Sequence, residues 1–192
     1  MRDGTIWHSA SGLIIQKPMC TIGDKMNNYK EYTDKYFLRS KKILQELGIN
    51  PLVRYQVFAR KDIDSIKGIE ETTSFIRQHA PKAHIYSVDR SSGYSGNTAA
   101  MKIEGRVQDL IDLETVYLGI LSGRNSPELD FDDVRKRTKE IVAAAQGKPV
   151  FYFGARHFHP EDDERIARIC REEGFVGTST DIGAKAWEKR GI

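Results

Sequence analysis

Residues 131–177, FDDVRKRTKEIVAAAQGKPVFYFGARHFHPEDDERIARICREEGFVG, decide the fold that this sequence predicts. Apolar periodicity and Gly/Pro breaks predict two helices and two short strands in alternation, over 131–145, 150–153, 160–173 and 175–177. Pro160 suits the first position of the second helix, because its missing N–H has no partner there in any case. Such alternation is typical of parallel α/β structure. We therefore expect 150–153, a short buried strand, to pair in parallel with 175–177.

The sequence before this stretch follows a different pattern. Thr33 is placed to cap a helix that runs to Leu47. Further helices are expected at 63–79, 108–121 and 180–189, and strands at 51–60, 84–88 and 98–104. A Ser/Gly-rich turn over 91–97 separates the last two strands. The first part of the chain is therefore α+β.

These patterns divide the chain of 192 residues into three parts. Residues 1–30 form an irregular N-terminal segment, 31–107 an α+β domain, and 108–192 the start of an α/β barrel domain. A barrel closes with about eight βα units. The predicted fold class is therefore α/β, with an incomplete barrel that is either a fragment or completed by a companion chain.

Composition excludes several classes of function. The net charge is only +3, and basic residues alternate with acids, as in 161–165, which does not favour nucleic acid. Apolar runs are too short to span a bilayer and no secretory signal is evident. Cys20 and Cys170 lack metal-binding spacing, and His157 and His159 lack a third ligand. We expect a cytoplasmic protein that binds neither nucleic acid nor membrane, and we predict no metal site at these cysteines and histidines.

Two short segments offer groups suited to a small anionic ring. Arg156 follows the expected strand 150–153, and a guanidinium can grip a carboxylate with two parallel hydrogen bonds. Phe153 adds an aromatic face three residues earlier, and Tyr36 stands close to Asp34 at the start of a helix. Together these residues predict a pocket for an aromatic carboxylate.

Each residue also has an interpretation without a ligand. Arg156 could form a surface salt bridge with a neighbour such as Asp162. Phe153 and Tyr36 could belong to the hydrophobic core. Asp34 could share the capping of the helix with Thr33.

Several segments, in this order, carry a resemblance to a known family. They are Tyr32-Thr33-Asp34-Lys35-Tyr36-Phe37-Leu38-Arg39, Ile103-Glu104-Gly105, Leu113-Glu114-Thr115-Val116-Tyr117-Leu118-Gly119-Ile120-Leu121, Phe153-Gly154-Ala155-Arg156 and Gly177-Thr178-Ser179. From residue 32 to the end, the chain resembles the N-terminal part of a nicotinate phosphoribosyltransferase.

The resemblance implies an activity and its partners. The enzyme would transfer phosphoribosyl from phosphoribosyl pyrophosphate to nicotinate, giving nicotinate mononucleotide and pyrophosphate in NAD salvage. It implies coupled ATP hydrolysis, Mg²⁺, and a homodimer or higher oligomer. The phosphate-binding half of the family would lie beyond this chain, so we expect no turnover from the chain alone.

The resemblance also implies roles for individual residues. Arg156 would bind the substrate carboxylate, while Phe153 and Tyr36 would stack on the pyridine ring, Tyr36 across a subunit interface. Asp34 would lie beside the site. At the position of Ser179 the nicotinamide-using relatives carry an acid, which would repel a carboxylate, so serine favours nicotinate. Ser179 could alternatively cap the following helix. No catalytic residue is predicted.

Two other functions stay open on the sequence alone. One is a related enzyme acting on quinolinate or nicotinamide. The other is an inactive truncated paralogue that serves as a binding or oligomerisation module.

Overall fold

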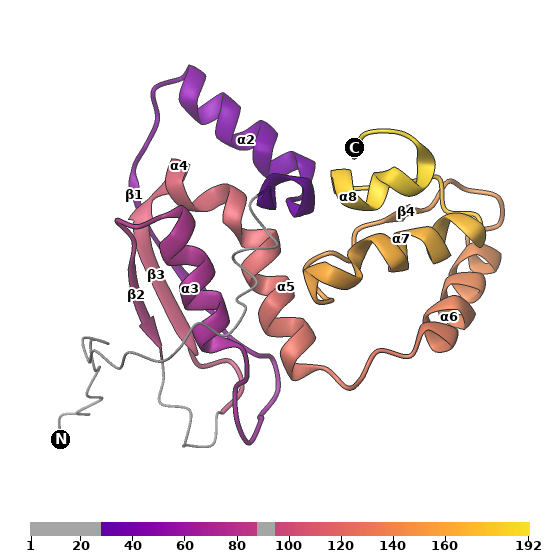
Figure 1. Ribbon diagram of the computed structural model, residues 1–192, viewed down its shortest axis with the longest axis horizontal. Coiled ribbons are helices and arrows are strands. Elements are labelled where there is room, and N and C mark those ends of the chain that lie inside the picture. Colours follow the sequence, from indigo (N-terminus) through magenta and orange to yellow (C-terminus); the bar gives the residue numbers. More distant parts are fainter. Residues whose placement is uncertain (1–27, 88–94) are drawn as a thin grey trace.

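The computed structural model describes residues 28–87 and 95–192. The irregular segment predicted for 1–30 lies outside the described residues except for its last three, and so does most of the turn at 91–97. The chain forms two halves that lie side by side, connected by an extended stretch between α5 and α6 (Figure 1).

The first half contains an antiparallel sheet with helices against it (Figure 1). Its elements are η1 (Tyr29–Tyr32), α2 (Lys35–Glu46), β1 (Leu52–Val57), α3 (Ile69–His79), β2 (His84–Ser87), β3 (Met101–Arg106), α4 (Val107–Leu110), η2 (Ile111–Leu113) and α5 (Glu114–Asn125). The strand order is β1-β3-β2, with β3 in the centre. The predicted α+β character of this half is confirmed.

The second half contains a small parallel sheet and the helices around it. Its elements are α6 (Phe131–Ala144), β4 (Phe151–Tyr152), η3 (Pro160–Asp162), α7 (Asp163–Glu172), β5 (Gly177–Thr178), α8 (Asp181–Ala184) and η4 (Lys185–Trp187). Phe151 pairs with Gly177 and Tyr152 with Thr178, in parallel. The predicted pairing of these two strands is confirmed, and helix and sheet are mixed as the α/β class requires.

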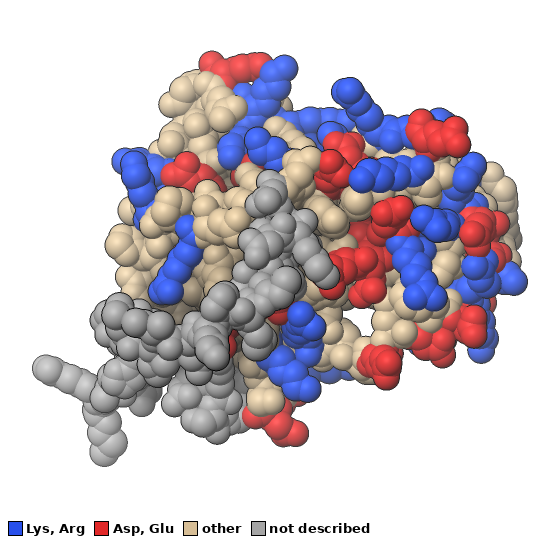
Figure 2. All heavy atoms as spheres, in the orientation of Figure 1, with Lys and Arg blue, Asp and Glu red and all other residues tan. Residues whose placement is uncertain are grey.

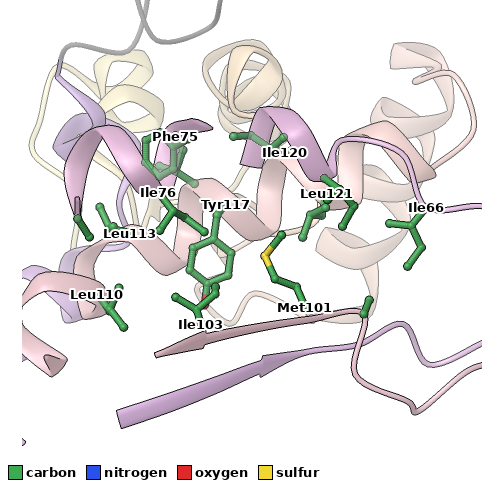
Figure 3. Close-up of a cluster of buried hydrophobic side chains, with 14 residues drawn as sticks. Ile66, Phe75, Ile76, Met101, Ile103, Leu110, Leu113, Tyr117, Ile120 and Leu121 are labelled. Carbon is green, nitrogen blue, oxygen red and sulfur yellow. The ribbon is translucent and has the colours of Figure 1, made fainter. Parts of the chain in front are cut away.

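One hydrophobic cluster fills the first half (Figure 3). Met101 and Ile103 point from β3 toward Ile76 of α3 and Ile120 of α5 (Figure 3). These four side chains are fully buried, and so is Val116 of α5 in the same cluster. Burial of a side chain of this size stabilises a fold by about 1.5–3 kcal/mol. This cluster therefore fixes α5, whose first turn belongs to the site described below.

A second, smaller cluster lies between α6, α7 and the parallel sheet. Its buried members are Tyr152, Ile166, Ala167, Cys170 and Phe175. The two clusters divide between residues 121 and 129, so α4 and α5 pack with the first half. The predicted domain boundary at 107/108 stays a prediction, because packing alone does not define a domain.

Two predicted helices are shorter or interrupted. The helix predicted over 63–79 begins only at Ile69, because Gly68 adopts a left-handed conformation with φ of 81° just before it. A Cβ at Gly68 would also lie 3.0 Å from Cγ of Arg124. The helix predicted over 108–121 divides into α4, η2 and α5, with Asp112 turned into the interior.

The last helix and the first short parallel strand also differ from the prediction. The helix predicted over 180–189 is α8 followed by the 3-10 turn η4. The strand predicted as buried over 150–153 is two residues long, and only its Tyr152 is buried. Phe151 and Phe153 are 41% and 48% exposed. No helix among the described residues is long and apolar enough to cross a membrane.

Candidate ligand-binding site at the junction of the two halves

Asp34 is the buried centre of a polar cluster between the two halves. It stands just before α2 and is 2% exposed. Its Oδ1 accepts a hydrogen bond from Oγ of Ser179 at 2.5 Å. Its Oδ2 accepts from the Tyr36 hydroxyl at 3.0 Å and from Oγ1 of Thr115 at 3.1 Å. Asp34 occupies the N-cap position, but its side chain makes no capping bond, so the capping alternative is wrong for the carboxylate.

Backbone contacts hold the segments of this cluster in register. The amide of Lys35 donates to the carbonyl of Ser179 at 2.8 Å, and the amide of Asp34 donates to Oγ1 of Thr115 at 3.0 Å. The Lys35 ammonium also pairs with Asp181 at 2.7 Å. The start of α2 is thereby attached to the start of α5 and to the loop after β5.

Arg156 enters the cluster from the loop after β4. Its Nε lies 3.5 Å from Oδ2 of Asp34, and its Nη1 donates to Oε1 of Glu114 at 3.2 Å. Its Cζ lies 5.9 Å from the ring centroids of Tyr36 and Phe37, within the range of cation–π attraction. The side chain keeps 36% of its surface exposed. A guanidinium held this way is oriented, yet open to solvent on one side.

The alternative that Arg156 forms a surface salt bridge with a sequence neighbour such as Asp162 is therefore wrong. The partners of Arg156 are Asp34 and Glu114, which come from the other half of the chain. An ion pair that joins two halves at a junction is positioned by the fold rather than by neighbouring sequence.

The electrostatics of the cluster are unbalanced. Burial raises the pKa of Glu114, and the Arg156 guanidinium opposes that shift. Burial and the Asp34 carboxylate raise the pKa of Tyr36, so its hydroxyl stays a neutral donor. With both carboxylates ionised, Arg156 faces two negative charges and the three groups sum to −1.

Phe153 presents an open aromatic face at the end of β4. Its ring is 48% exposed, so the alternative that it belongs to the core is wrong. The chain turns tightly after it, since a Cβ at Gly154 would overlap the Tyr152 ring. Of the predicted site residues, contacts in the structure join Asp34, Tyr36, Arg156 and Ser179. Phe153 lies beside the loop after β4 and is exposed.

Ser179 is fully buried and its hydroxyl is committed to Asp34. The N-cap of α8 is Thr180, whose Oγ1 accepts from the amide of Gly183 at 3.1 Å. The capping alternative for Ser179 is therefore wrong by one residue. In this geometry the Ser179 side chain contacts the cluster through Asp34.

A second buried carboxylate lies behind this loop. Asp163 is 1% exposed and its Oδ2 accepts from the Thr180 hydroxyl at 2.6 Å. Desolvation raises the pKa of Asp163 to about 6, although the hydroxyls of Thr180 and Tyr152 oppose the shift. Oδ1 of Asp163 and the Tyr152 hydroxyl are buried without a hydrogen bond of normal geometry. Within residues 28–87 and 95–192, this carboxylate has no cationic partner.

The sequence patterns missed three contributors to the site. Glu114, Thr115 and Phe37 all lie in family-like segments, but the resemblance implies no role for them. A usable signal was present. Two polar residues at 114 and 115 begin a helix whose next six residues, VYLGIL, are mostly apolar, and polar side chains at the start of such a buried helix are costly unless they have partners.

A cavity of about 500 Å³ lies elsewhere, between the α5–α6 connection and residues 157–162. Figure 2 shows an opening through the molecule there, with acidic and basic side chains interspersed around it. His157 and His159 line it, and none of the five predicted site residues does. We place the site at the Arg156 cluster because the fixed cation and the aromatic rings are there. Among the described residues, no three His, Cys, Asp or Glu side chains are grouped to hold a metal ion.

Comparison with protein-family models and with curated proteins finds no match for the sequence. Solved structures do match. A nicotinate phosphoribosyltransferase from Vibrio cholerae has a TM-score of 0.58 and 15% identity, covering 84% of this chain and 49% of its own. A putative nicotinate phosphoribosyltransferase from Saccharomyces cerevisiae has a TM-score of 0.60 and 12% identity, covering 84% and 52%.

A nicotinate-nucleotide pyrophosphorylase from Pyrococcus furiosus is 27% identical over 86% of this chain and 43% of its own, with a TM-score of 0.45. The chain shares the fold of the matched part of the two nicotinate phosphoribosyltransferase structures, and the resemblance is confirmed at the level of fold. It spans about half the length of those structures. Fold alone does not define a substrate.

Proposed function

We propose that this chain supplies the pyridine-binding part of a nicotinate phosphoribosyltransferase. The reaction is the transfer of phosphoribosyl from phosphoribosyl pyrophosphate to nicotinate, which yields nicotinate mononucleotide and pyrophosphate for NAD biosynthesis. Support comes from the shared fold with two such structures and from the chemistry at the junction.

One observation carries the proposal: the guanidinium of Arg156 lies at the carboxyl end of β4, oriented by Asp34 and open on one side. Parallel α/β structures place their ligands at this end of the strands. A carboxylate is the ligand group that a planar guanidinium binds best.

The other predicted residues have complementary roles. Phe153 and Tyr36 supply aromatic faces for the pyridine ring, which stacking recognises without reference to its substituent. Asp34 holds Arg156 in place, and Ser179 fixes the Asp34 carboxylate. An acid in place of Ser179 would face Asp34 and add repulsion against an anionic ligand.

Mg²⁺ and ATP belong to the proposed reaction, but the described residues do not fit them. They contain no group of three metal-ligating side chains, and the sequence contains no Gly-x-x-x-x-Gly-Lys phosphate loop. The described residues therefore have no proposed role in binding Mg²⁺ or ATP, and none is proposed as catalytic.

We also propose that the protein works as a homodimer in the cytoplasm. The outer face of α2 and the start of β1 support the dimer, because Ile43, Leu47 and Leu52 are 54%, 65% and 69% exposed. A companion chain that completes the barrel is the alternative, since Phe151 and Phe153 leave the parallel sheet apolar on one side. The mass in solution, measured by light scattering with and without Leu47→Glu, distinguishes a dimer through α2 from other arrangements.

Isothermal titration of nicotinate and nicotinamide tests the substrate. Arg156→Ala should weaken nicotinate by about 30-fold or more, about 2 kcal/mol, the lower end for losing a charge pair because Arg156 is partly exposed. Arg156→Lys should restore little, because an ammonium lacks the planar fork. Nicotinamide should change by less than about threefold in both.

Phe153→Ala is the matched control for ring recognition. Loss of one stacking face should weaken both ligands equally, by about 0.5–1.5 kcal/mol. If Arg156→Ala and Phe153→Ala affect the two ligands alike, the carboxylate is not what Arg156 recognises and the proposed substrate is wrong.

A further inference from the structure

Glu114 occupies the position where a ligand carboxylate would meet Arg156. Its Oε1 accepts from Nη1 of Arg156 at 3.2 Å. Within the described part of the chain, Arg156 is the one hydrogen-bonding partner of this carboxylate. Glu114 is therefore held by the same group that the proposed function assigns to nicotinate.

The two carboxylates around Arg156 are held very differently. Asp34 is 2% exposed and accepts from Ser179, Tyr36 and Thr115, so it cannot move without breaking the junction. The side chain of Glu114 is 24% exposed and has a single contact to lose. Of the two acids, Glu114 is the one that can leave.

Charge gives a reason why it should leave. Arg156 with both acids ionised sums to −1, which repels an incoming anion. Removing Glu114 from the guanidinium frees Nη1 and takes one negative charge away from the ligand position. The pKa of Glu114 is raised by burial, which shows that its ionised form is poorly solvated where it now lies.

We propose that Glu114 is an internal competitor that occupies Arg156 in the empty site and is displaced when a ligand carboxylate binds. Asp34 stays on Nε throughout and keeps the guanidinium oriented. Glu114 then sets the affinity for anionic ligands and leaves neutral ones unaffected. This inference rests on the proposed function, since it takes Arg156 as the carboxylate-binding group.

Glu114→Gln is the test, and Glu104→Gln is its matched control. The Glu104 side chain is 22% exposed and pairs with Arg54 at 2.6 Å on the antiparallel sheet. Glu104→Gln therefore removes the same charge as Glu114→Gln, from a side chain of similar exposure that also pairs with an arginine. Titration with nicotinate should show affinity rising about three- to tenfold in Glu114→Gln. Nicotinamide should change by less than twofold, and Glu104→Gln should change neither.

A second readout needs no ligand. Phenylglyoxal modifies free guanidinium groups, and peptide mapping by mass spectrometry measures its rate at each arginine. The rate at Arg156 should rise in Glu114→Gln and not in Glu104→Gln, whereas Arg54 should show the reverse. The reciprocal pattern separates release of one arginine from general loosening of the fold.

The outcomes are distinct. Unchanged Arg156 reactivity in Glu114→Gln, or nicotinate affinity that stays equal or falls, overturns the inference. A second outcome is that Arg156 reactivity rises in Glu114→Gln but neither this variant nor wild type binds nicotinate. Glu114 would then still be the group that occupies Arg156, and the proposed substrate would be wrong. Raised reactivity with tighter nicotinate binding supports both.

Discussion

The two halves of the molecule each bury an aspartate outside the site, and they treat it in opposite ways. In the first half Asp112 is fully buried, and its carboxylate accepts from the Lys41 ammonium at 2.9 and 3.0 Å and from the Tyr29 hydroxyl at 2.9 Å. In the second half Asp163 is as deeply buried, but among the described residues it has the hydroxyls of Thr180 and Tyr152 as neighbours and no cation. Buried charge is therefore compensated in one half and not in the other.

The aromatic side chains beside the two cores differ in exposure. Phe75 in the core of the first half is 3% exposed, while Phe151 and Phe153 of the second half are 41% and 48% exposed. The contrast is confined to these aromatics, because the first half also exposes Phe58 and Leu47, at 52% and 65%. The second half keeps an open apolar face and an uncompensated carboxylate next to the loop that bears Ser179, which are features expected where a protein binds rather than only packs.

The largest expected difference between the halves is in aromatic truncation. Phe75→Ala should lower the free energy of unfolding by about 3–5 kcal/mol, because it leaves a cavity in a filled core. Phe153→Ala should cost less than about 1 kcal/mol, because half of the ring is in solvent already. Urea denaturation of both variants measures the difference, and equal losses would contradict the contrast.

Loss of the compensated carboxylate should come next. Asp112→Ala leaves the Lys41 ammonium without its partner and should cost about 3 kcal/mol, the lower end for breaking a buried pair, because Lys41 is 23% exposed. Asp109→Ala, at an exposed position of α4, is the control and should change stability by less than about 0.5 kcal/mol. Urea denaturation at pH 7 measures the free energy of unfolding of both variants. Equal losses would contradict the idea that the pair of Asp112 with Lys41 of α2 stabilises the first half.

The uncompensated carboxylate should show itself through pH. The pKa of Asp163 is raised by burial from 3.8 to about 6, so its contribution to stability is full below pH 3.8 and is lost as pH rises through 6. Relative to Asp163→Asn, wild type should therefore lose about 2–3 kcal/mol of unfolding free energy between pH 4 and pH 7.

Thermal and urea unfolding across that pH range measures this linkage. Asp162→Asn, at the adjacent and more exposed position, should follow wild type at each pH. A constant difference between wild type and Asp163→Asn would mean that Asp163 has the same pKa folded and unfolded, and the contrast between the two buried aspartates would disappear.

Much of the fold was predictable because local rules agreed with it. The Gly and Pro breaks and the apolar periodicity placed α2, α6 and the pairing of β4 with β5 correctly. The predicted cap at Thr33 is wrong, because the N-cap of α2 is Asp34 and the Thr33 hydroxyl donates to the carbonyl of Asp112 instead. Errors arose where tertiary contacts prevail over periodicity. Helix α3 begins later than predicted because Gly68 packs against Arg124. The helix predicted over 108–121 is interrupted where Asp112 turns toward Lys41.

The site was predictable in part, for a similar reason. Arg156, Tyr36, Asp34 and Ser179 lie together within one chain, whereas the resemblance implies that Tyr36 reaches the site across a subunit interface. The roles of these residues stay predictions. Glu114 was not found, because nothing local in the sequence shows that the start of α5 lies against the loop after β4. Contacts between distant segments are what the sequence patterns lacked.

The central claim is that Arg156 binds a pyridine carboxylate, and a crystal structure of the protein with nicotinate tests it most directly. We expect the nicotinate carboxylate within about 2.7–2.9 Å of two guanidinium nitrogens of Arg156, with Glu114 moved off Nη1 and Asp34 still hydrogen-bonded to Ser179. Nicotinate bound elsewhere, or bound here while Glu114 keeps its contact with Arg156, would contradict the account.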